Sequence, residues 1–387
     1  MPPVFSIILA QLFGTSLWFA ANGAAGDLMH AWHLTAADIG LLTNAVQLGF
    51  IIGTLTFSLS GLADRFAASR IFAVCAVSGA ILNAMFAFGA HGLQAGLPLR
   101  FAIGICLAGI YPLSMKLIVS WVPDRAGNAL SQLIGMQTIG VALPYGVRAV
   151  GASWPWQPSM LVSSALALIA AAMIWRLGDG PHLVRAAGAG SLDIRRLLSI
   201  FAIPNFRAAA LGYFGHMWEL YAFWTLVPTF IIVSGVASQS TAALSGWSFV
   251  VTAAGAIGCM AGGLWSKRIG SARVAAAALA TSALCCALFP LSGTWGMSAK
   301  ILLLLAWGIS VVADSPHFSA LSAKACPPEM VGSALAFQNA IGFAISMVSI
   351  QIGAGIVENW GSTVAWLLLP GPLLGLMGLR RLIKAGA

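Results

Sequence analysis

The sequence predicts an all-α membrane protein with twelve transmembrane helices in two pseudo-symmetric six-helix halves. Of its 387 residues, 59% are hydrophobic and only 7% are charged, whereas charged residues make up about a quarter of a soluble domain. Apolar stretches of about 20 residues, enough for one helical span, recur along the whole chain. These unbroken runs lack the alternation of a membrane β-strand, so they predict helices.

Short charged segments show that the two halves are related copies. The segment SGLADRFAASR covers residues 60–70, and the similar GLWSKRIGSAR returns in the second half, where Arg268 corresponds to Arg65. A second pair of segments matches at nearly the same spacing, with Pro316 corresponding to Pro112. The chain is therefore predicted to be a tandem repeat of one membrane module.

The spans follow from the apolar runs in order. In the first half they are predicted near residues 4–26, 38–60, 70–90, 97–121, 128–150 and 157–177. In the second half they are predicted near residues 208–233, 240–264, 273–291, 298–323, 330–354 and 361–379. The polar, turn-rich residues between the halves predict three parts: a bundle over 1–177, a cytoplasmic linker over 178–207 with a short amphipathic helix near 194–200, and a bundle over 208–387.

The formal charge of +9 is explained by topology. Most of the 19 Lys and Arg residues fall in loops on one side of the predicted spans, and cytoplasmic loops collect such residues. We therefore expect a multi-pass protein of the plasma (bacterial inner) membrane, monomeric, with both termini cytoplasmic and no nucleic-acid partner. The N-terminus lacks the positive region of a cleavable signal peptide and is interpreted as the first span.

No cofactor or metal centre is expected from the sequence. The six cysteines have no CxxC spacing and lie mostly in apolar segments, which is typical of small buried residues. The chain also lacks a Walker A loop, an HExxH motif and a GxSxG elbow. An enzyme is therefore not expected, and without a nucleotide site the driving force for any transport would be a gradient.

The loop after the second span carries a recognisable motif. Leu62–Arg65 match the centre of the pattern G-x-L-A-D-R-x-G-R-R, although Ser60 and Ala67 stand at its two glycine positions. Arg100 and Gly104 match a second pattern, R-x-x-x-G, in the fourth span. With these motifs and the twelve-span repeat, the chain resembles the major facilitator superfamily of secondary transporters over its whole length.

The resemblance implies a central cavity lined chiefly by spans 1, 4, 7 and 10. It also implies that Asp64 lies against the N-terminus of span 11, where the helix dipole favours an anion. Arg65 and Arg268 would join this gate, with simple anchoring at the cytoplasmic surface as the alternative. For Arg100 the family implies a role in proton movement.

Corresponding helix breaks in two halves of a transporter point to its binding site. Pro112 and Pro316 lack an N–H and predict such breaks, which free the carbonyls of Ala108 and Val312. A packing kink is the alternative. Lys116 lies one turn beyond Pro112, where a cation needs a partner or an anionic substrate, unless it extends to the cytoplasmic interface.

Acid and histidine pairs on spans 7 and 10 predict proton coupling. His216 and Glu219 are three residues apart and so share a helical face, and Asp314 and His317 repeat the pattern around Pro316. An ionised carboxylate is costly near the bilayer midplane, so a carboxyl there can act as a reversible proton carrier. A static polar network is the alternative.

Further side chains could supply hydrogen bonds or stacking to a substrate, although ordinary packing explains each one equally well. They are Gln11, Tyr111, Trp218 and Tyr221.

The sequence as a whole predicts a proton-coupled secondary transporter that works by alternating access, and Lys116 favours a small organic or inorganic anion as substrate. A proton-driven exporter of amphipathic compounds is the alternative, since the seventh span is rich in aromatic residues. A non-transporting membrane sensor, or a metal transporter that uses His216, His317 and scattered methionines, remains a further alternative.

Overall fold

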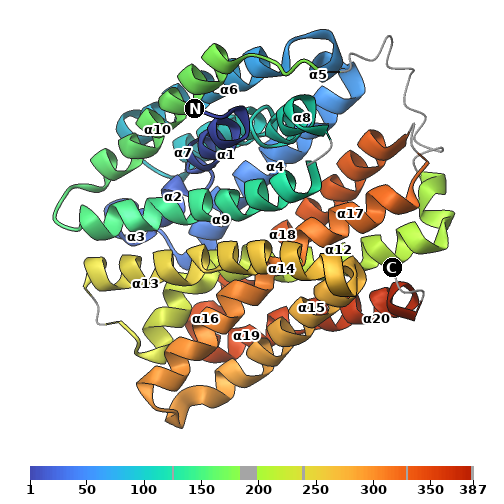
Figure 1. Ribbon diagram of the computed structural model, residues 1–387. Coiled ribbons are helices and arrows are strands. Elements are labelled where there is room, and N and C mark those ends of the chain that lie inside the picture. Colours follow the sequence, from blue (N-terminus) through green and yellow to red (C-terminus); the bar gives the residue numbers. More distant parts are fainter. Residues whose placement is uncertain (124–125, 184–197, 238–239, 328–329, 385–387) are drawn as a thin grey trace. The chain divides into compact units, whose positions relative to one another are not determined.

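The computed structural model is built of helices (Figure 1) and describes residues 1–123, 126–183, 198–237, 240–327 and 330–384. These ranges contain no strand. The chain divides into two compact units: Met1–Gly190 with Ser240–Phe249 form the first, and Ser191–Gln239 with Val250–Ala387 form the second. Each unit is described by itself.

The helices of the first half of the chain begin and end close to the predicted spans. They are α1 (Pro3–Thr15), α2 (Ala20–Gly23), α3 (Ala25–Trp32), α4 (Ala36–Ser60), α5 (Leu62–Arg65), α6 (Ala68–Gly89), α7 (Leu93–Ala108), α8 (Tyr111–Trp121), α9 (Ala126–Val150) and α10 (Trp156–Leu177). In this unit α4 packs along α7, and α10 packs along α6 and α1.

In the second half the helices cover the predicted spans, but the helix of the eleventh span continues to Trp360 and the predicted twelfth span is divided among three helices. Its helices are η2 (Ile200–Ala202), α12 (Pro204–Ser234), α13 (Thr241–Ala253), α14 (Gly255–Ile269), α15 (Ser271–Leu288), η3 (Phe289–Thr294), α16 (Met297–Ala313), α17 (Ser315–Ala325), α18 (Val331–Trp360), η5 (Gly361–Val364), α19 (Ala365–Leu368) and α20 (Pro370–Lys384). Because α12 starts at Pro204, the helix takes up the last residues of the predicted linker. Most of the amphipathic helix predicted near 194–200 lies outside the described residues.

Within the described part of the chain, ten helical stretches are long and apolar enough to cross a membrane. One of them, Val331–Lys384, contains both of the last two predicted spans. The first predicted span is not among the ten because it is divided into shorter helices. The helices thus agree with the expected twelve spans.

The first span differs from the prediction of one continuous helix. Helix α1 ends at Thr15 and α2 begins only at Ala20. The Ser16 hydroxyl donates to the carbonyl of Phe13 at 2.7 Å, a local bond that competes with the helical pattern. Arg100 of α7 is completely buried and donates to the Leu17 carbonyl at 3.1 Å and to the Trp18 carbonyl. Its guanidinium therefore supplies the bonds that the interrupted helix lacks.

Two corresponding glycines allow close helix crossings in the two units. A Cβ added to Gly104 would lie 2.1 Å from the Val46 carbonyl oxygen, where α7 crosses α4. A Cβ added to Gly308 would lie 2.0 Å from the Val251 carbonyl oxygen, where α16 meets α13. The repeat seen in the sequence is thus also a repeat of backbone contacts, as expected where small residues set helix packing in membranes.

We expect Gly104→Ala to destabilise the first unit by about 1–3 kcal/mol, because the new methyl group must displace the backbone of α4. Gly355→Ala is a matched control: Gly355 also lies within a helix, but a Cβ there would meet nothing within 4 Å. The measurement is the thermal unfolding midpoint in detergent. Equal midpoints for the two variants would contradict the proposed crossing.

Candidate functional site

The buried carboxyl of Glu219 is the centre of a polar cluster inside the second unit. Glu219 lies on α12 and is 1% exposed. Its Oε1 atom accepts hydrogen bonds from the Ser282 hydroxyl, from Cys286 Sγ at 3.2 Å and from Trp307 Nε1 at 2.6 Å. These donors come from α15 and α16, so three helices meet at one oxygen atom.

The Trp307 donor is held in place by aromatic packing. Its ring centroid lies 4.6 Å from that of Phe223, 5.2 Å from that of Phe230 and 5.7 Å from that of Phe289. All four side chains are buried. Because such packing leaves the indole little rotational freedom, its N–H stays directed at the Glu219 carboxyl.

One turn earlier on α12, His216 meets the second acid of the cluster. His216 Nδ1 lies 2.8 Å from Asp314 Oδ1, but neither atom makes an aligned hydrogen bond among the described residues. The contact is thus one of proximity between the imidazole ring and the carboxyl group. Because His216 lies one turn before Glu219 on α12, the contact between His216 and Asp314 neighbours the Glu219 carboxyl.

Asp314 and His317 lie at the break in the tenth span. Helix α16 ends at Ala313 and α17 begins at Ser315, with Asp314 between them. The Val312 carbonyl accepts from Cys259 Sγ at 3.4 Å, which compensates for the bond that Pro316 removes. His317 Nδ1 lies 3.4 Å from the Ser271 hydroxyl at the start of α15. In the fourth span a similar break separates α7, which ends at Ala108, from α8, and Pro112 lies in the first turn of α8.

The predicted site residues of the first unit lie on α1 and α8. Lys116 is half-buried on α8. Tyr111 begins the same helix and stacks on Phe50 with 6.3 Å between the ring centroids. Gln11 on α1 is fully buried, and among the described residues its side-chain amide has no hydrogen-bond partner. A buried amide of this kind is costly unless water or a ligand satisfies it.

The aromatic side chains of α12 pack within the second unit. Trp218 Nε1 donates to the Leu367 carbonyl at 2.8 Å. Tyr221 is 3% exposed, and its ring lies 5.2 Å from Trp224 and 5.1 Å from Phe343 between centroids. These contacts correspond to the packing alternative considered for both residues.

The gate residues lie near the charged turns that the sequence singled out. Arg65 is exposed at the end of α5, and Arg268 is exposed in the last turn of α14. Gly61, just before α5, has φ 65°, a conformation that favours glycine. The Asp64 side chain and residues 328–329, which precede α18, lie outside the described part, so the implied contact of Asp64 with span 11 stays a prediction.

Sequence reasoning missed the three donors to Glu219 and treated Cys286 only as a small buried residue. The sequence showed only that these donors lie in apolar segments. It could not show that they meet Glu219, because they are 63 to 88 residues away in the chain. The helical spacing placed His216 beside Glu219, whereas in the fold the nearest acid to the imidazole ring is Asp314. Arg100, to which the resemblance assigned a role in proton movement, is wholly buried. Among the described residues, no group of three or more His, Cys, Asp or Glu side chains is placed to hold a metal.

Comparison with known proteins identifies related families and folds. The family model described as Major Facilitator Superfamily matches residues 7–350. The niacin transporter NiaP of Acinetobacter baylyi (strain ATCC 33305 / BD413 / ADP1) is 33% identical over 96 residues, which are 25% of this chain and 21% of that protein.

Two solved structures have a similar fold. The human organic anion transporter MFSD10 (TETRAN) has a TM-score of 0.70 at 15% identity and covers 97% of this chain and 98% of its own. A point mutant of the nucleoside transporter NupG has a TM-score of 0.71 at 16% identity and covers 99% of each chain.

Proposed function

Because the chain belongs to the major facilitator superfamily, we propose that it is a proton-coupled secondary transporter that moves a small solute by alternating access. The observation that supports the coupling is the buried acid and histidine cluster of the second unit. Intramembrane ionisable groups are costly and are usually retained for function. Here Asp314 and His317 lie at or next to the break between α16 and α17. The other acid and histidine, Glu219 and His216, lie on α12, and His216 contacts Asp314.

The contacts of Glu219 suit a group that gains and loses a proton. Three donors converge on Oε1 and stabilise a negative charge there. Complete burial among apolar helices opposes that charge. A carboxyl between these opposing influences can respond to a small rearrangement of α15 or α16. Asp314 and His216, at 2.8 Å, provide a second pair that can share the proton.

A small organic or inorganic anion is the substrate class that we propose. Lys116 supports this class because a half-buried ammonium group on a broken span can pair with an anionic solute. The transported compound in the name of the relative from Acinetobacter baylyi, niacin, is a carboxylic acid. The unsatisfied amide of Gln11 is a further group that could bind a polar solute.

A thermal-shift screen of the purified protein tests the substrate class. It compares small anions, amphipathic cations and divalent metals at two pH values. We expect an anion to raise the unfolding midpoint, because a ligand that binds the folded state stabilises it by mass action. Stabilisation by amphipathic cations alone would favour the exporter alternative and contradict the anion assignment.

Replacing Lys116 with alanine is expected to weaken binding of the anion found in that screen by more than about tenfold, since a charge-assisted hydrogen bond is lost. Lys324→Ala is the matched control, because Lys324 is exposed in the last turn of α17. Isothermal titration of both variants measures the effect. Unchanged affinity in Lys116→Ala would assign Lys116 to the membrane interface instead.

A further inference from the structure

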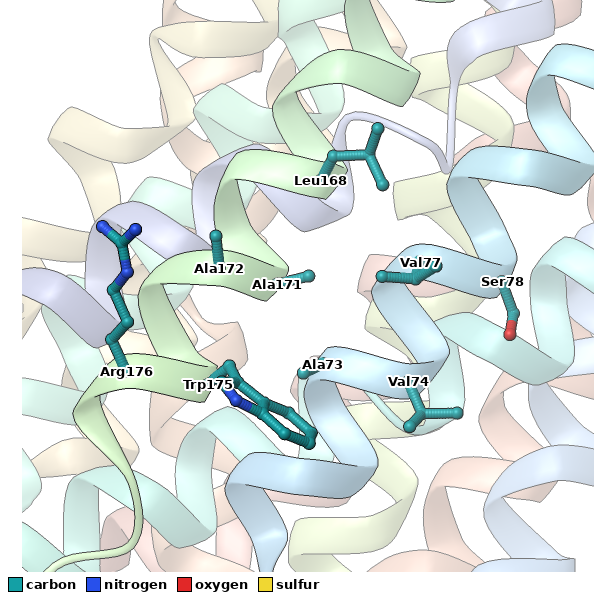
Figure 2. A pocket seen from close by; sticks show the side chains of 9 residues that line it. All are labelled: Ala73, Val74, Val77, Ser78, Leu168, Ala171, Ala172, Trp175 and Arg176. Carbon is teal, nitrogen blue, oxygen red and sulfur yellow. The ribbon is translucent and has the colours of Figure 1, made fainter.

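A groove of the first unit lies between side chains of the packed helices α6 and α10 (Figure 2). It has a volume of about 440 Å³, within the range of small-molecule pockets. Ala73 and Ala171 are nearly fully buried and form its floor. Val74 and Leu168, which are 59% and 47% exposed, form its walls. The gap exists because alanines occupy the positions where larger side chains would fill it.

The groove has a polar end as well as an apolar body. Trp175 belongs to its lining, and in Figure 2 the indole extends from α10 toward Ala73 on α6. The guanidinium carbon of Arg70 lies 5.8 Å from the centre of the Trp175 ring. Arg176 is also part of the lining, and both arginines are exposed. Arg70 and the Trp175 indole therefore mark one end of the apolar groove. Arg176 lines the groove from α10, and in Figure 2 its guanidinium is directed away from α6.

At this end a hydrogen bond links the first turn of α6 to the segment that follows α10. The backbone N–H of Ser69 donates to Asp179 Oδ1 at 2.8 Å. The carboxylate of Asp179 is thus already hydrogen-bonded to the backbone at the start of α6. Arg70 and Arg176 are among the basic residues that the positive-inside rule assigns to the cytoplasmic side. This end of the groove would therefore lie at the cytoplasmic surface.

We propose that the groove binds an anionic phospholipid of the adjacent leaflet. One acyl chain lies between Val74 and Leu168 on the alanine floor, and the phosphate contacts Arg70 and Arg176. Basic pockets between transmembrane helices are a known form of headgroup recognition in membranes. Tryptophan side chains are enriched at the depth of the lipid headgroups. Trp175 is therefore at the level where the acyl chain of the lipid would enter the groove. A further helix is a poor occupant, because it requires a long continuous face rather than a short groove with a cationic end.

Native mass spectrometry of the full chain tests the proposal. The probes are phosphatidylglycerol and phosphatidylcholine with identical acyl chains. We expect the wild type to retain phosphatidylglycerol preferentially. Arg70→Gln and Arg176→Gln should each lower that retention about fivefold, the effect of one arginine near an anionic headgroup. Retention of phosphatidylcholine should change less, because its choline cation already neutralises the phosphate charge. The single variants Arg273→Gln and Arg380→Gln are the charge-matched controls, because both residues are exposed in the second unit.

A second variant tests the groove itself. Ala172 lines it and is exposed, so Ala172→Trp fills the space without displacing buried atoms. Loss of the preferentially bound lipid, with an unchanged unfolding midpoint after delipidation, supports the proposal. Equal retention of the two lipids by the wild type would overturn it. Wild-type retention in either the arginine variants or Ala172→Trp would overturn it as well.

Discussion

Replacing Glu219 with glutamine is expected to abolish substrate accumulation driven by a proton gradient while sparing substrate exchange. Glutamine has nearly the same shape, and its amide oxygen can still accept from Ser282 and from Trp307, which lies 2.6 Å from Oε1 in the native protein. The amide cannot take up or release a proton. The variant is therefore fixed in the state that corresponds to the neutral carboxyl.

The measurement compares two modes of transport in proteoliposomes: uptake under an imposed pH gradient, and exchange of labelled for unlabelled substrate without one. Glu358→Gln is the control, because Glu358 is an exposed carboxylate near the end of α18. Gradient-driven accumulation at the wild-type level in Glu219→Gln would remove this carboxyl from the coupling mechanism. Loss of both modes would assign it a structural role.

Replacing Arg100 with leucine is expected to cause the largest loss of stability of any single substitution proposed for this protein. The guanidinium donates to the Leu17 and Trp18 carbonyls at the break between α1 and α2. A hydrogen bond to a charged group contributes about 1.5–3 kcal/mol, and two carbonyls would be left buried without donors. The expected loss is therefore about 3–6 kcal/mol.

The unfolding midpoint in detergent measures this loss, and Arg207→Leu provides the control because Arg207 is exposed near the start of α12. Arg100→Lys should recover only part of the stability, since an ammonium group cannot span both carbonyls as the planar guanidinium does. If Arg100→Leu unfolds at the wild-type temperature, the break in the first span is held by other contacts.

The positions of the spans could be predicted from the sequence because each helix must present a long apolar stretch to the membrane. The start of α4 at Ala36 and the end of α10 at Leu177 both fall within two residues of the predicted limits. The breaks at Pro112 and Pro316 were also predictable, since proline removes a backbone donor wherever it lies. In each case the cause is local to the segment.

The break in the first span could not be predicted in this way. No proline lies between Thr15 and Ala20, and the carbonyls freed there are satisfied by Arg100, which is more than 80 residues distant in the chain. Composition could show only that an arginine lay within an apolar segment. Its partners depend on how α7 packs against the start of the chain, which is a tertiary property.

The candidate site shows the same limit. Helical spacing correctly placed His216 and Glu219 on one helix, one turn apart, but it could not show that their partners differ. Glu219 binds donors from α15 and α16, whereas His216 contacts Asp314. Those contacts depend on the order in which the helices of the second unit pack. A single sequence contains no direct signal for that order.

The measurement that tests proton coupling most directly is the internal pH of proteoliposomes during substrate flux. A gradient of the anion identified by thermal shift is imposed with no initial pH difference, and an enclosed pH-sensitive dye is followed. We predict that substrate flux through the wild-type protein moves protons and changes the internal pH, and that the change disappears with Glu219→Gln. Substrate flux of normal rate with constant internal pH would contradict the account.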